Sequence, residues 1–370
     1  MLTGARERRL ARNLATMRSV TPKPSVYWLL IFVPLSFVAE FAFHQPVLVF
    51  ALSCVAIIPL AGLIGRATDQ LAMHAGPRVG GLLNATFGNI TELIIAILLV
   101  RAQQFDVVKA SLIGSILSNL LLVLGASYLA GGFRFTEQRF SARAVAVHSA
   151  SLLLAVAGLL MPAVFVATAH DTAAQREVVS ITVAAVLIVV YAAALLFTLV
   201  THTHIFGALP AHEKAQWPVS RALAVLLVAA VVVGVESEFL VGSLEPTVET
   251  LGLSKLFVGL FVVAIIGNAA EHASAVVFAL RNKMELSIEI AFGSSIQIAL
   301  LVAPLLVFVS LAIGPPMDFV FSTFEVVAVA LATLIVSVIS LDGRSNWLEG
   351  LQLLAVYVIL GVSFFYVGSP

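Results

Sequence analysis

Apolar stretches long enough to cross a lipid bilayer recur along almost the whole chain. A hydrocarbon core of about 30 Å needs about 20 apolar helical residues to cross it. Of the 370 residues, 61% are hydrophobic and 11% are charged, which is far from the averages of soluble domains. The stretches lie near 26–43, 46–66, 80–100, 107–130, 144–168, 177–200, 221–241, 256–280, 286–313, 319–340 and 347–367. We therefore predict an all-α polytopic membrane protein of about 11 transmembrane helices in a lipid bilayer.

The polar residues exclude several classes of function. The one cysteine, Cys54, leaves no disulfide framework and no cysteine-type metal site. The basic residues do not gather on a soluble face suited to nucleic acid. The apolar stretches contain no H-E-x-x-H, no G-x-S-x-G and no aspartate dyad, so we expect neither an enzyme nor a bound cofactor.

The distribution of Lys and Arg predicts the orientation. Residues 1–25 form a basic arm before the first apolar stretch, and we expect this arm to be cytoplasmic. If successive connections alternate between the two sides of the membrane, most of the other Lys and Arg residues fall on the cytoplasmic side. The opposite side then holds only Arg101, Lys109, Arg176 and Lys255. The N-terminus should therefore be cytoplasmic and the C-terminus outside. With no organelle-targeting extension in the sequence, we predict a prokaryotic plasma (inner) membrane, while an organellar membrane stays open.

Two segments of the chain repeat each other. GGLLNATFGNITELIIAIL at 80–98 matches GLFVVAIIGNAAEHASAVV at 259–277 at an offset of 179 residues. This offset pairs Gly88 with Gly267, Asn89 with Asn268 and Glu92 with Glu271. The same offset, without a gap, pairs Gly114 and Ser115 of GSILSNLLLV with Gly293 and Ser294 of GSSIQIALLV. Internal repeats of this kind are typical of secondary transporters.

The repeats predict the domain organisation. We expect the basic arm at 1–25, the first helix and first repeat at 26–200, a cytoplasmic linker at 201–220 and the second repeat at 221–370. Each repeat then holds five spans, and an odd number reverses the second copy in the membrane. A pseudo-twofold axis in the membrane plane should bring the two GN-x-x-E segments together at mid-membrane depth.

Glu92 and Glu271 are the leading functional candidates. If the third span begins near Gly80, Glu92 lies about 18 Å into it at 1.5 Å per residue. An ionised carboxylate at that depth costs at least a few kcal/mol unless it is paired, hydrated or protonated, so intramembrane glutamates are functional candidates by default. A structural buried pair or a hydrogen-bonded neutral acid is the alternative for these two residues.

The neighbouring residues predict an all-oxygen cation site. Asn89 and Asn268 each lie three residues before a glutamate, on the same helix face, although they could also serve only to bond helices together. Gly88 and Gly267 should loosen the helices and expose carbonyl oxygens. Such a site suits a hard divalent cation, and Ca²⁺ tolerates irregular oxygen coordination better than Mg²⁺. Without the cation, the close carboxylates should take up a proton, which is competition of the kind an antiporter uses.

Further polar residues are weaker candidates. Ser115, Ser294 and Gln297 could line the ion pathway or only pack between helices. His272 follows Glu271 and could relay protons, but adjacent residues point about 100° apart on a helix, so a structural hydrogen bond is equally compatible. Other glutamates near the outer end of the seventh span could form an outward mouth for cations or simply a solvated helix end; these are Glu236, Glu238 and Glu245.

The motifs NATFGNITELI and GNAAEHASAV, with GSILSN and GSSIQIALLVAP behind them, resemble the repeat motifs of the calcium/proton exchanger (CAX) family of the calcium:cation antiporter superfamily. The resemblance covers residues from about 26 to 368. It implies a first helix followed by two inverted five-helix repeats, and it implies that Glu92 and Glu271 exchange Ca²⁺ for H⁺ by alternating access. Family members usually carry an acidic stretch before the seventh helix, whereas the linker here holds only Glu213, so any role for that stretch is in doubt.

Three alternatives stay open from the sequence. A sodium/calcium exchanger shares the inverted repeats and the equivalent glutamates, and Mn²⁺ or another divalent cation could use the same oxygens. A cation channel could also use buried carboxylates, but it would normally form a ring by oligomerisation, while here one chain supplies two halves. Stoichiometry and homo-oligomerisation cannot be read from the sequence.

Overall fold

The computed structural model describes residues 26–169, 172–206 and 215–367, apart from the side chain of Pro77. The predicted basic arm and positions 207–214 of the predicted linker therefore lie outside the described residues. Two short strands, β1 (Gln138–Arg139) and β2 (Arg344–Ser345), pair antiparallel, and nearly all of the remaining described chain is helical.

The helices follow one another with short connections. The first span consists of η1 (Val26–Ile31), α2 (Phe32–Val38) and η2 (Ala39–Phe43). The next group is α3 (Pro46–Ala75), α4 (Pro77–Phe87), α5 (Ile90–Arg101), α6 (Phe105–Leu117), η3 (Ser118–Val123), α7 (Leu124–Arg134), α8 (Ala142–Thr168), α9 (Ala173–Leu196) and η4 (Phe197–Thr201). After η5 (Thr203–Ile205) come α10 (Val219–Leu251), α11 (Lys255–Phe257), η6 (Val258–Val263), α12 (Ala264–Gly267), α13 (Ala269–Leu280), α14 (Met284–Gln297), η7 (Ile298–Val302), α15 (Ala303–Ile313), α16 (Thr323–Ile339) and α17 (Trp347–Val367).

The structure confirms the predicted all-α membrane fold. Within the described residues, 9 helices are long and apolar enough to cross a membrane. One bent pair, Lys255–Gly267 with Ala269–Leu280, and the shorter apolar helix Thr323–Ile339 supply the other predicted spans. Large apolar side chains such as Val231, Val358 and Ile359 are more than 60% exposed, as expected of surfaces that face lipid rather than water.

Two helices are longer than the apolar stretches that predict them. The stretch at 46–66 lies within a helix that ends at Ala75, and the stretch at 221–241 lies within a helix that ends at Leu251. Hydropathy marks the part of a helix that lies in lipid, whereas Ala, Leu, Met and Gln beyond Arg66 continue to favour helix in a polar environment. Both helices therefore extend past the apolar segment.

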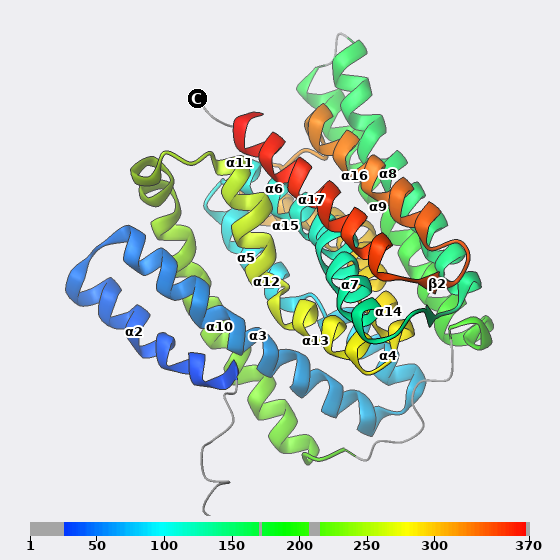
Figure 1. Ribbon diagram of the computed structural model, residues 1–370. Helices are drawn as coiled ribbons and strands as arrows, with labels where there is room; N and C mark the ends of the chain where they lie inside the picture. The colour runs from blue at the N-terminus through cyan, green and yellow to red at the C-terminus, as the bar shows by residue number, and fades with distance from the viewer. Residues whose placement is uncertain (1–25, 170–171, 207–214, 368–370) are drawn as a thin grey trace, which may run out of the picture.

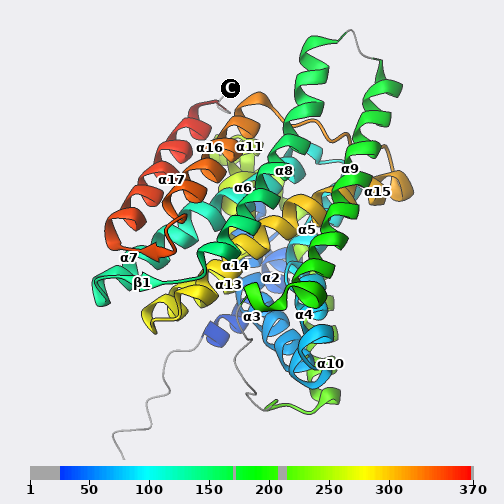
Figure 2. The same ribbon diagram turned by 90° about the vertical axis from the view of Figure 1, so that its right-hand side faces the viewer.

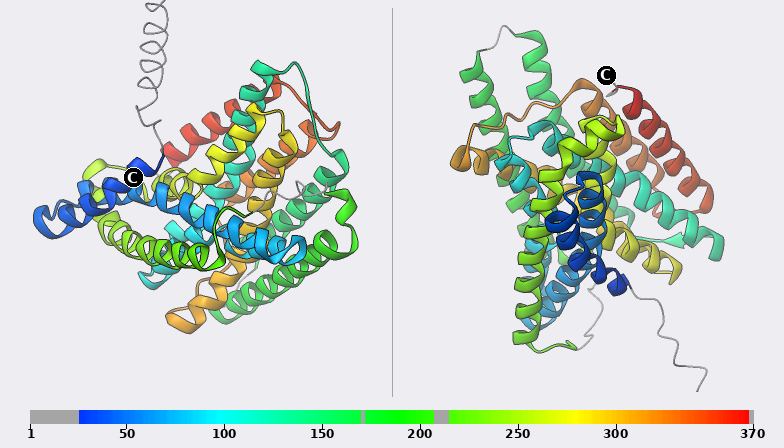
Figure 3. Two further views of the ribbon diagram at one scale, coloured as in Figure 1. Left: turned by 90° about the horizontal axis from the view of Figure 1, so that it is seen from below. Right: turned by 90° about the vertical axis from the view of Figure 1, so that its left-hand side faces the viewer.

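These two long helices, α3 and α10, pack along each other over much of their length (Figure 1). Their contact buries Leu60, Ile64 and Ala67 of α3 against Ala222 and Val233 of α10, in a small core separate from the main one. The first span lies against the same pair, at one side of the molecule, as the view from below shows (Figure 3).

The remaining helices form the main core. α7 packs on α17, α8 on α16, and α9 on α15, and the hairpin of α8 and α9 projects beyond the other helices (Figure 2). Close approach of α7 and α17 depends on small residues, since a Cβ on Gly350 would lie 2.3 Å from the backbone nitrogen of Leu129. Small residues at helix contacts are the usual means of tight packing in membranes.

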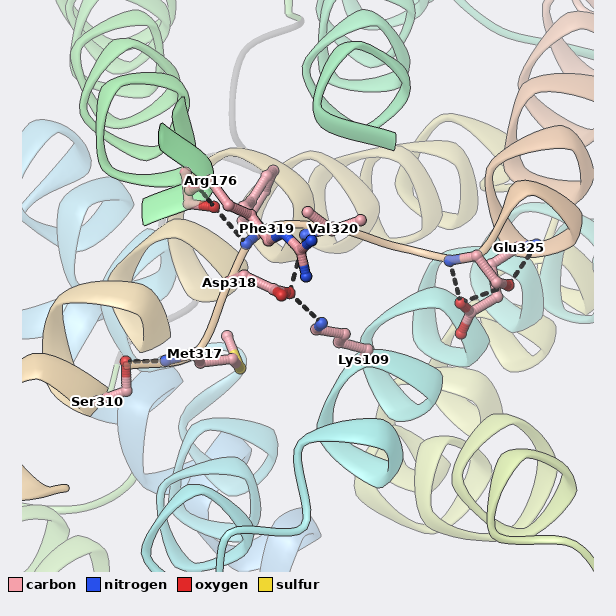
Figure 4. A network of polar contacts seen from close by, with 10 residues as sticks. Lys109, Arg176, Ser310, Met317, Asp318, Phe319, Val320 and Glu325 are labelled. Atoms are coloured by element: carbon pink, nitrogen blue, oxygen red, sulfur yellow. Dashed lines mark hydrogen bonds and ion pairs between the residues drawn. The ribbon is translucent and has the colours of Figure 1, made fainter. Parts of the chain in front are cut away.

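An extended segment, residues 314–322, joins α15 to α16 and crosses the ends of several helices (Figure 4). The backbone N–H of Met317 donates to Ser310 Oγ (2.9 Å), and that of Phe319 donates to Ser180 Oγ of α9 (2.9 Å). Asp318 pairs with Lys109 of α6. These contacts satisfy backbone groups that an extended segment would otherwise leave unpaired.

The predicted span at 319–340 begins too early. Residues 319–321 are extended, and the aromatic rings of Phe319 and Phe321 are buried in the segment rather than in a helix. The helix starts only after Ser322, whose side chain accepts the N–H of Glu325 while Glu325 accepts the N–H of Ser322. This reciprocal capping sets the boundary, which hydropathy alone could not mark.

The glycines Gly114 and Gly293 occupy equivalent repeat positions but meet different surroundings. A Cβ on Gly114 would lie 2.1 Å from the carbonyl oxygen of Leu260, whereas one on Gly293 would meet nothing within 4 Å. We expect Gly114→Ala to lower stability by about 1–3 kcal/mol because backbone must shift to admit the methyl group. Thermal unfolding of the detergent-purified protein measures the difference.

Gly293→Ala is the matched control for that substitution. It should be neutral or slightly stabilising, because Ala favours a helix over Gly by up to about 1 kcal/mol. Equal melting temperatures for the two variants would contradict the close contact of α6 with η6.

Candidate functional site

Two broken helices carry the repeated glutamates. α4 ends at Phe87 and α5 begins at Ile90, while α12 ends at Gly267 and α13 begins at Ala269 with a bend of 61°. Gly and Asn favour helix weakly, and an Asn side chain competes for backbone hydrogen bonds, so Gly–Asn is a natural place for a break. Glu92 and Glu271 each fall in the first turn of the following helix, where the helix dipole favours negative charge.

The two broken helices place each glutamate opposite the glycine of the other repeat. A Cβ on Gly267 would lie 3.1 Å from Cγ and 3.4 Å from Oε1 of Glu92. A Cβ on Gly88 would lie 3.8 Å from Oε1 of Glu271. The contact is reciprocal, as expected from a pseudo-twofold axis between the repeats. Gly267 makes room for the carboxyl group of Glu92, whereas a Cβ on Gly88 would press mainly on the carbonyl oxygen of Asn84, at 2.7 Å.

The paired carboxyl groups interact electrostatically and are incompletely satisfied. Glu92 and Glu271 lie close enough for mutual charge repulsion. The Oε2 atom of each is buried without a hydrogen-bond partner. Two close carboxylates in a low-dielectric environment need a cation or a proton to neutralise them. The structure therefore brings together the two acids that the sequence predicted as the centre of the site.

The asparagines are fixed by serines of the opposite repeat. Asn268 Nδ2 donates to Ser115 Oγ (2.9 Å), and Ser294 Oγ donates to Asn89 Oδ1 (2.7 Å). Both asparagine side chains are almost fully buried. The two bonds are related by the 179-residue offset, so each repeat orients the amide of the other.

One amide oxygen is left free to coordinate a cation. Asn268 Nδ2 also donates to the carbonyl of Ala264 (2.8 Å), and its Oδ1 is buried without a partner. In Asn89 the unpartnered atom is Nδ2 instead. A half-turn of the Asn89 amide would let Nδ2 donate to Ser294 and would free its oxygen as well.

The polar surroundings extend from the glutamates on both sides. Gln297 Oε1 would lie 3.5 Å from a Cβ on Gly88, so Gln297 and Glu271 both border this glycine. A small cavity next to Glu92 is lined by Ser111 and Ser115 among apolar residues. Sequence alone did not single out Ser111, although it lies four residues before Ser115 and therefore on the same helix face.

His272 has a separate partner. Its Nε2 lies 3.2 Å from Oδ1 of Asn119, on the π-helical turn η3. Asn119 belongs to the motif GSILSN, but it has Ile298 as its repeat equivalent, so the repeat comparison gave no signal for it. The relay role of His272 stays a prediction.

A further acid near the site was missed by the sequence. Asp69 of α3 interacts electrostatically with Glu271 and is partly exposed. It lies beyond Arg66, where the apolar stretch ends, so hydropathy gave no reason to place it near a mid-membrane glutamate. The extension of α3 as a long helix brings it there.

The predicted outer mouth is not formed as a group. Glu236 is fully buried and bonds to Ser36 of the first span, so its assignment to a mouth is wrong. Glu238 pairs with Arg101, and Glu245 pairs with Lys255. The three acids do not converge because Glu236 lies on one side of α10 while Glu238 and Glu245, two turns apart, lie on the other.

Comparison with known proteins decides the family. A family model described as sodium/calcium exchanger protein matches residues 45–200 and 221–366. The chain belongs to this family. Three similar proteins are named Ca²⁺/H⁺ antiporter. That of Aphanothece halophytica is 43% identical over 357 residues, covering 92% of this chain and 96% of the relative.

The other two named antiporters are equally similar to this exchanger. The Synechocystis protein is 45% identical over 359 residues, covering 91% of this chain and 96% of the relative. ChaA of Bacillus subtilis is 43% identical over 339 residues, covering 90% of this chain and 96% of the relative. The resemblance to the calcium/proton exchangers seen in the repeat motifs is therefore confirmed.

Solved structures agree with the fold of the exchanger. The structure of YfkE is 40% identical, covers 92% of this chain and 100% of its own, and superposes with a TM-score of 0.82. An H⁺/Ca²⁺ exchanger named CAX is 14% identical, covers 93% of this chain and 92% of its own, and has a TM-score of 0.70. The latter likeness shows the fold alone.

The cross-repeat bond that Asn268 donates to Ser115 gives a testable role in the exchanger. We expect Ser115→Ala to weaken Ca²⁺ binding about fivefold, because the amide of Asn268 loses a hydrogen bond of about 1 kcal/mol that orients its oxygen. Calcium titration of the purified protein by calorimetry measures the change.

Ser118→Ala is the matched control on the same helix. The Ser118 hydroxyl donates to the carbonyl of Ser115 within the helix backbone and does not contact Asn268. Calcium affinity should stay unchanged in this variant. An equal loss in both variants would show that Ser115 acts only through helix packing.

Proposed function

We propose that this protein is a secondary active transporter that exchanges Ca²⁺ for H⁺ across a membrane. The observation that carries the proposal is the reciprocal placement of Glu92 and Glu271, each with a buried and unpartnered carboxylate oxygen. The names of the similar antiporters from three bacteria support the same ion pair.

The donor set fits calcium as the transported ion. Carboxylate oxygens of Glu92 and Glu271, with amide oxygens of Asn89 and Asn268, form a hard all-oxygen site. Ser115 and Ser294 orient those amides, and Gln297 offers another oxygen beside Gly88. Mn²⁺ could use the same oxygens, because it also prefers carboxylate and carbonyl ligands.

Competition for the same oxygens couples the two ions. Protons that neutralise the paired carboxylates leave no charge to hold Ca²⁺, and Ca²⁺ that binds both carboxylates displaces the protons. An exchanger that changes access only when the site is neutralised moves one ion against the other. His272, held by Asn119, could pass protons to Glu271, but its bond to Asn119 serves structure equally well.

A sodium-driven exchange is the second candidate. The family description names sodium and calcium together, so it does not decide the coupling ion. A structure of a sodium-calcium exchanger is 18% identical with a TM-score of 0.55, which supports the shared fold and no more. The named relatives above 40% identity favour protons.

We further propose that the N-terminus is cytoplasmic and the C-terminus outside, in a prokaryotic plasma membrane. Basic residues gather around the paired strands, where Arg344 and Arg139 both bond to Glu137 and Arg134 donates to the carbonyl of Leu280. An excess of Arg and Lys is the usual mark of the cytoplasmic side.

Proteoliposomes test the function directly. In sodium-free buffer, an imposed pH gradient should drive Ca²⁺ uptake by the wild type, while Glu92→Gln and Glu271→Gln should each abolish it, because one carboxylate cannot hold the divalent cation. Glu177→Gln, at an exposed glutamate of α9, is the matched control and should transport normally. Uptake is measured with radioactive calcium.

Two outcomes would overturn the proposal. Uptake that needs a sodium gradient instead of a pH gradient would assign the protein to sodium-driven exchange. Normal uptake by both glutamine variants would mean that the ion binds elsewhere.

The competition also predicts a pH dependence. Lowering the pH on the side from which Ca²⁺ binds should raise the KM for Ca²⁺, since protonated carboxyl groups do not bind the ion. The effect should fade as the pH rises and the proton no longer competes. Initial uptake rates at several calcium concentrations and pH values measure it, and a KM independent of pH would exclude a shared site.

A further inference from the structure

Glu236 lies buried beneath the first span, away from the paired glutamates. Glu236, near the middle of α10, is 0% exposed, and so are Ser36 of α2, Ser53 of α3 and the adjacent Ser237. Glu236 Oε2, Ser53 Oγ and Ser237 Oγ are buried without hydrogen-bond partners. The repeat equivalent of Glu236 is Ile57, so internal symmetry does not account for this polar cluster.

The two short contacts of Ser36 are both satisfied by linear hydrogen bonds when Glu236 carries a proton. Ser36 Oγ lies 2.6 Å from the carbonyl oxygen of Val33 and 2.7 Å from Oε1 of Glu236. A hydroxyl group has one proton to donate, and a carbonyl oxygen can only accept. If Ser36 donates to Val33, the short contact with Glu236 requires a proton on the carboxyl group, which then donates to Ser36.

The charges around Glu236 lead to the same assignment. On α10 itself, Glu238 turns away to Arg101 and Glu245 turns to Lys255. The basic residues nearest along the packed helices are engaged with the Trp217 ring; these are Arg66 of α3 and Arg221 of α10.

The other ionisable groups of these elements are also directed elsewhere. Asp69 of α3 interacts with Glu271, and His74 bonds to the carbonyl of Trp217. Glu40 of the first span is half-buried at the end of that span, four residues beyond Ser36, and Glu249 of α10 is exposed. No cation among the described residues of these helices contacts Glu236. An ionised carboxylate there would be buried and uncompensated, which costs several kcal/mol.

We propose that Glu236 is a proton-binding site separate from the paired glutamates, and that its proton fastens the first span to α10. The protonated carboxyl group joins α10 to Ser36 of α2 and lies close to Ser53 of α3. Loss of this proton leaves a negative charge on Glu236 that the surrounding serine hydroxyl groups cannot neutralise. This assignment holds whichever ion drives exchange.

The first span packs chiefly on α3 and meets α10 at only a few residues, so the bond to Glu236 is a large part of its contact with α10. Only a small share of it is buried, and it contacts α10 mainly through Phe37 and Phe41, whose rings pack edge-on against Phe239. Deprotonation of Glu236 in alkaline solution must therefore either admit water or separate α2 from α10. The neutral state keeps the span docked.

Infrared spectroscopy and spin-label distances test the two halves of the proposal. The difference spectrum of wild type minus Glu236→Gln at neutral pH should contain the carbonyl stretching band of a protonated carboxyl group, because this substitution keeps the size and removes the proton site without changing Glu92 or Glu271. Glu238→Gln, at the exposed neighbour, is the matched control and should keep the band. Ser36→Ala should shift the band because its hydrogen bond is lost.

For the second half, spin labels at exposed Ile31 and Val231 in a Cys54→Ala background report the distance between the first span and α10. This distance should increase in alkaline solution in the wild type and stay constant with pH in Glu236→Gln. Neither readout depends on transport, so a failure of the proposed exchange would not affect it.

Three results would overturn the proposal. A difference spectrum of wild type minus Glu236→Gln without that band would mean that Glu236 is ionised. A wild-type label distance that is constant with pH would show that the proton does not fasten the helix. Loss of the band on adding sodium at constant pH would show a monovalent-cation site in place of a proton site. If Glu236→Gln fails to fold, the Ser36→Ala band shift decides the first half alone.

Discussion

The rest of this structure depends on the cost of placing two carboxyl groups close together in a low-dielectric interior. Glu92 and Glu271 can occupy that place only when a cation or protons neutralise them. The broken helices follow from this requirement, because they direct helix N-termini and free amide groups toward the acids. Gly267 follows too, since any larger residue at this position would press on the carboxyl group of Glu92.

Hydrogen bonds that run from each repeat to the other hold the site together. Each half supplies an acid, an asparagine and a serine, but each asparagine bonds to the serine of the other half. Neither repeat can therefore build the site alone, and a shift of one repeat against the other must strain two hydrogen bonds at once. Ion binding, which also joins the two halves, can thereby influence which arrangement the repeats adopt.

The sequence was sufficient for the helices and the paired acids, because hydropathy and a repeat at a constant offset report those features directly. It was insufficient where the deciding contact lies between distant segments. Asp69 falls outside its apolar stretch, Asn119 has no repeat equivalent, and the orientation of Glu236 depends on which side of α10 meets the first span. The start of α16 was set by a cap and by two buried phenylalanines, neither of which hydropathy measures.

The two repeats share their site motif but not its surroundings, and this difference bears on how the protein works. Gly114 meets the backbone of Leu260 while Gly293 faces open space, Ser118 corresponds to Gln297, and Ile57 corresponds to Glu236. If the halves were identical, the inward-open and outward-open states would have equal energy in the absence of ions. Unequal packing and one acid without a counterpart in the other repeat make the two energies differ. The preference of the ion-free exchanger for one of these two states is therefore determined by residues outside the symmetric site.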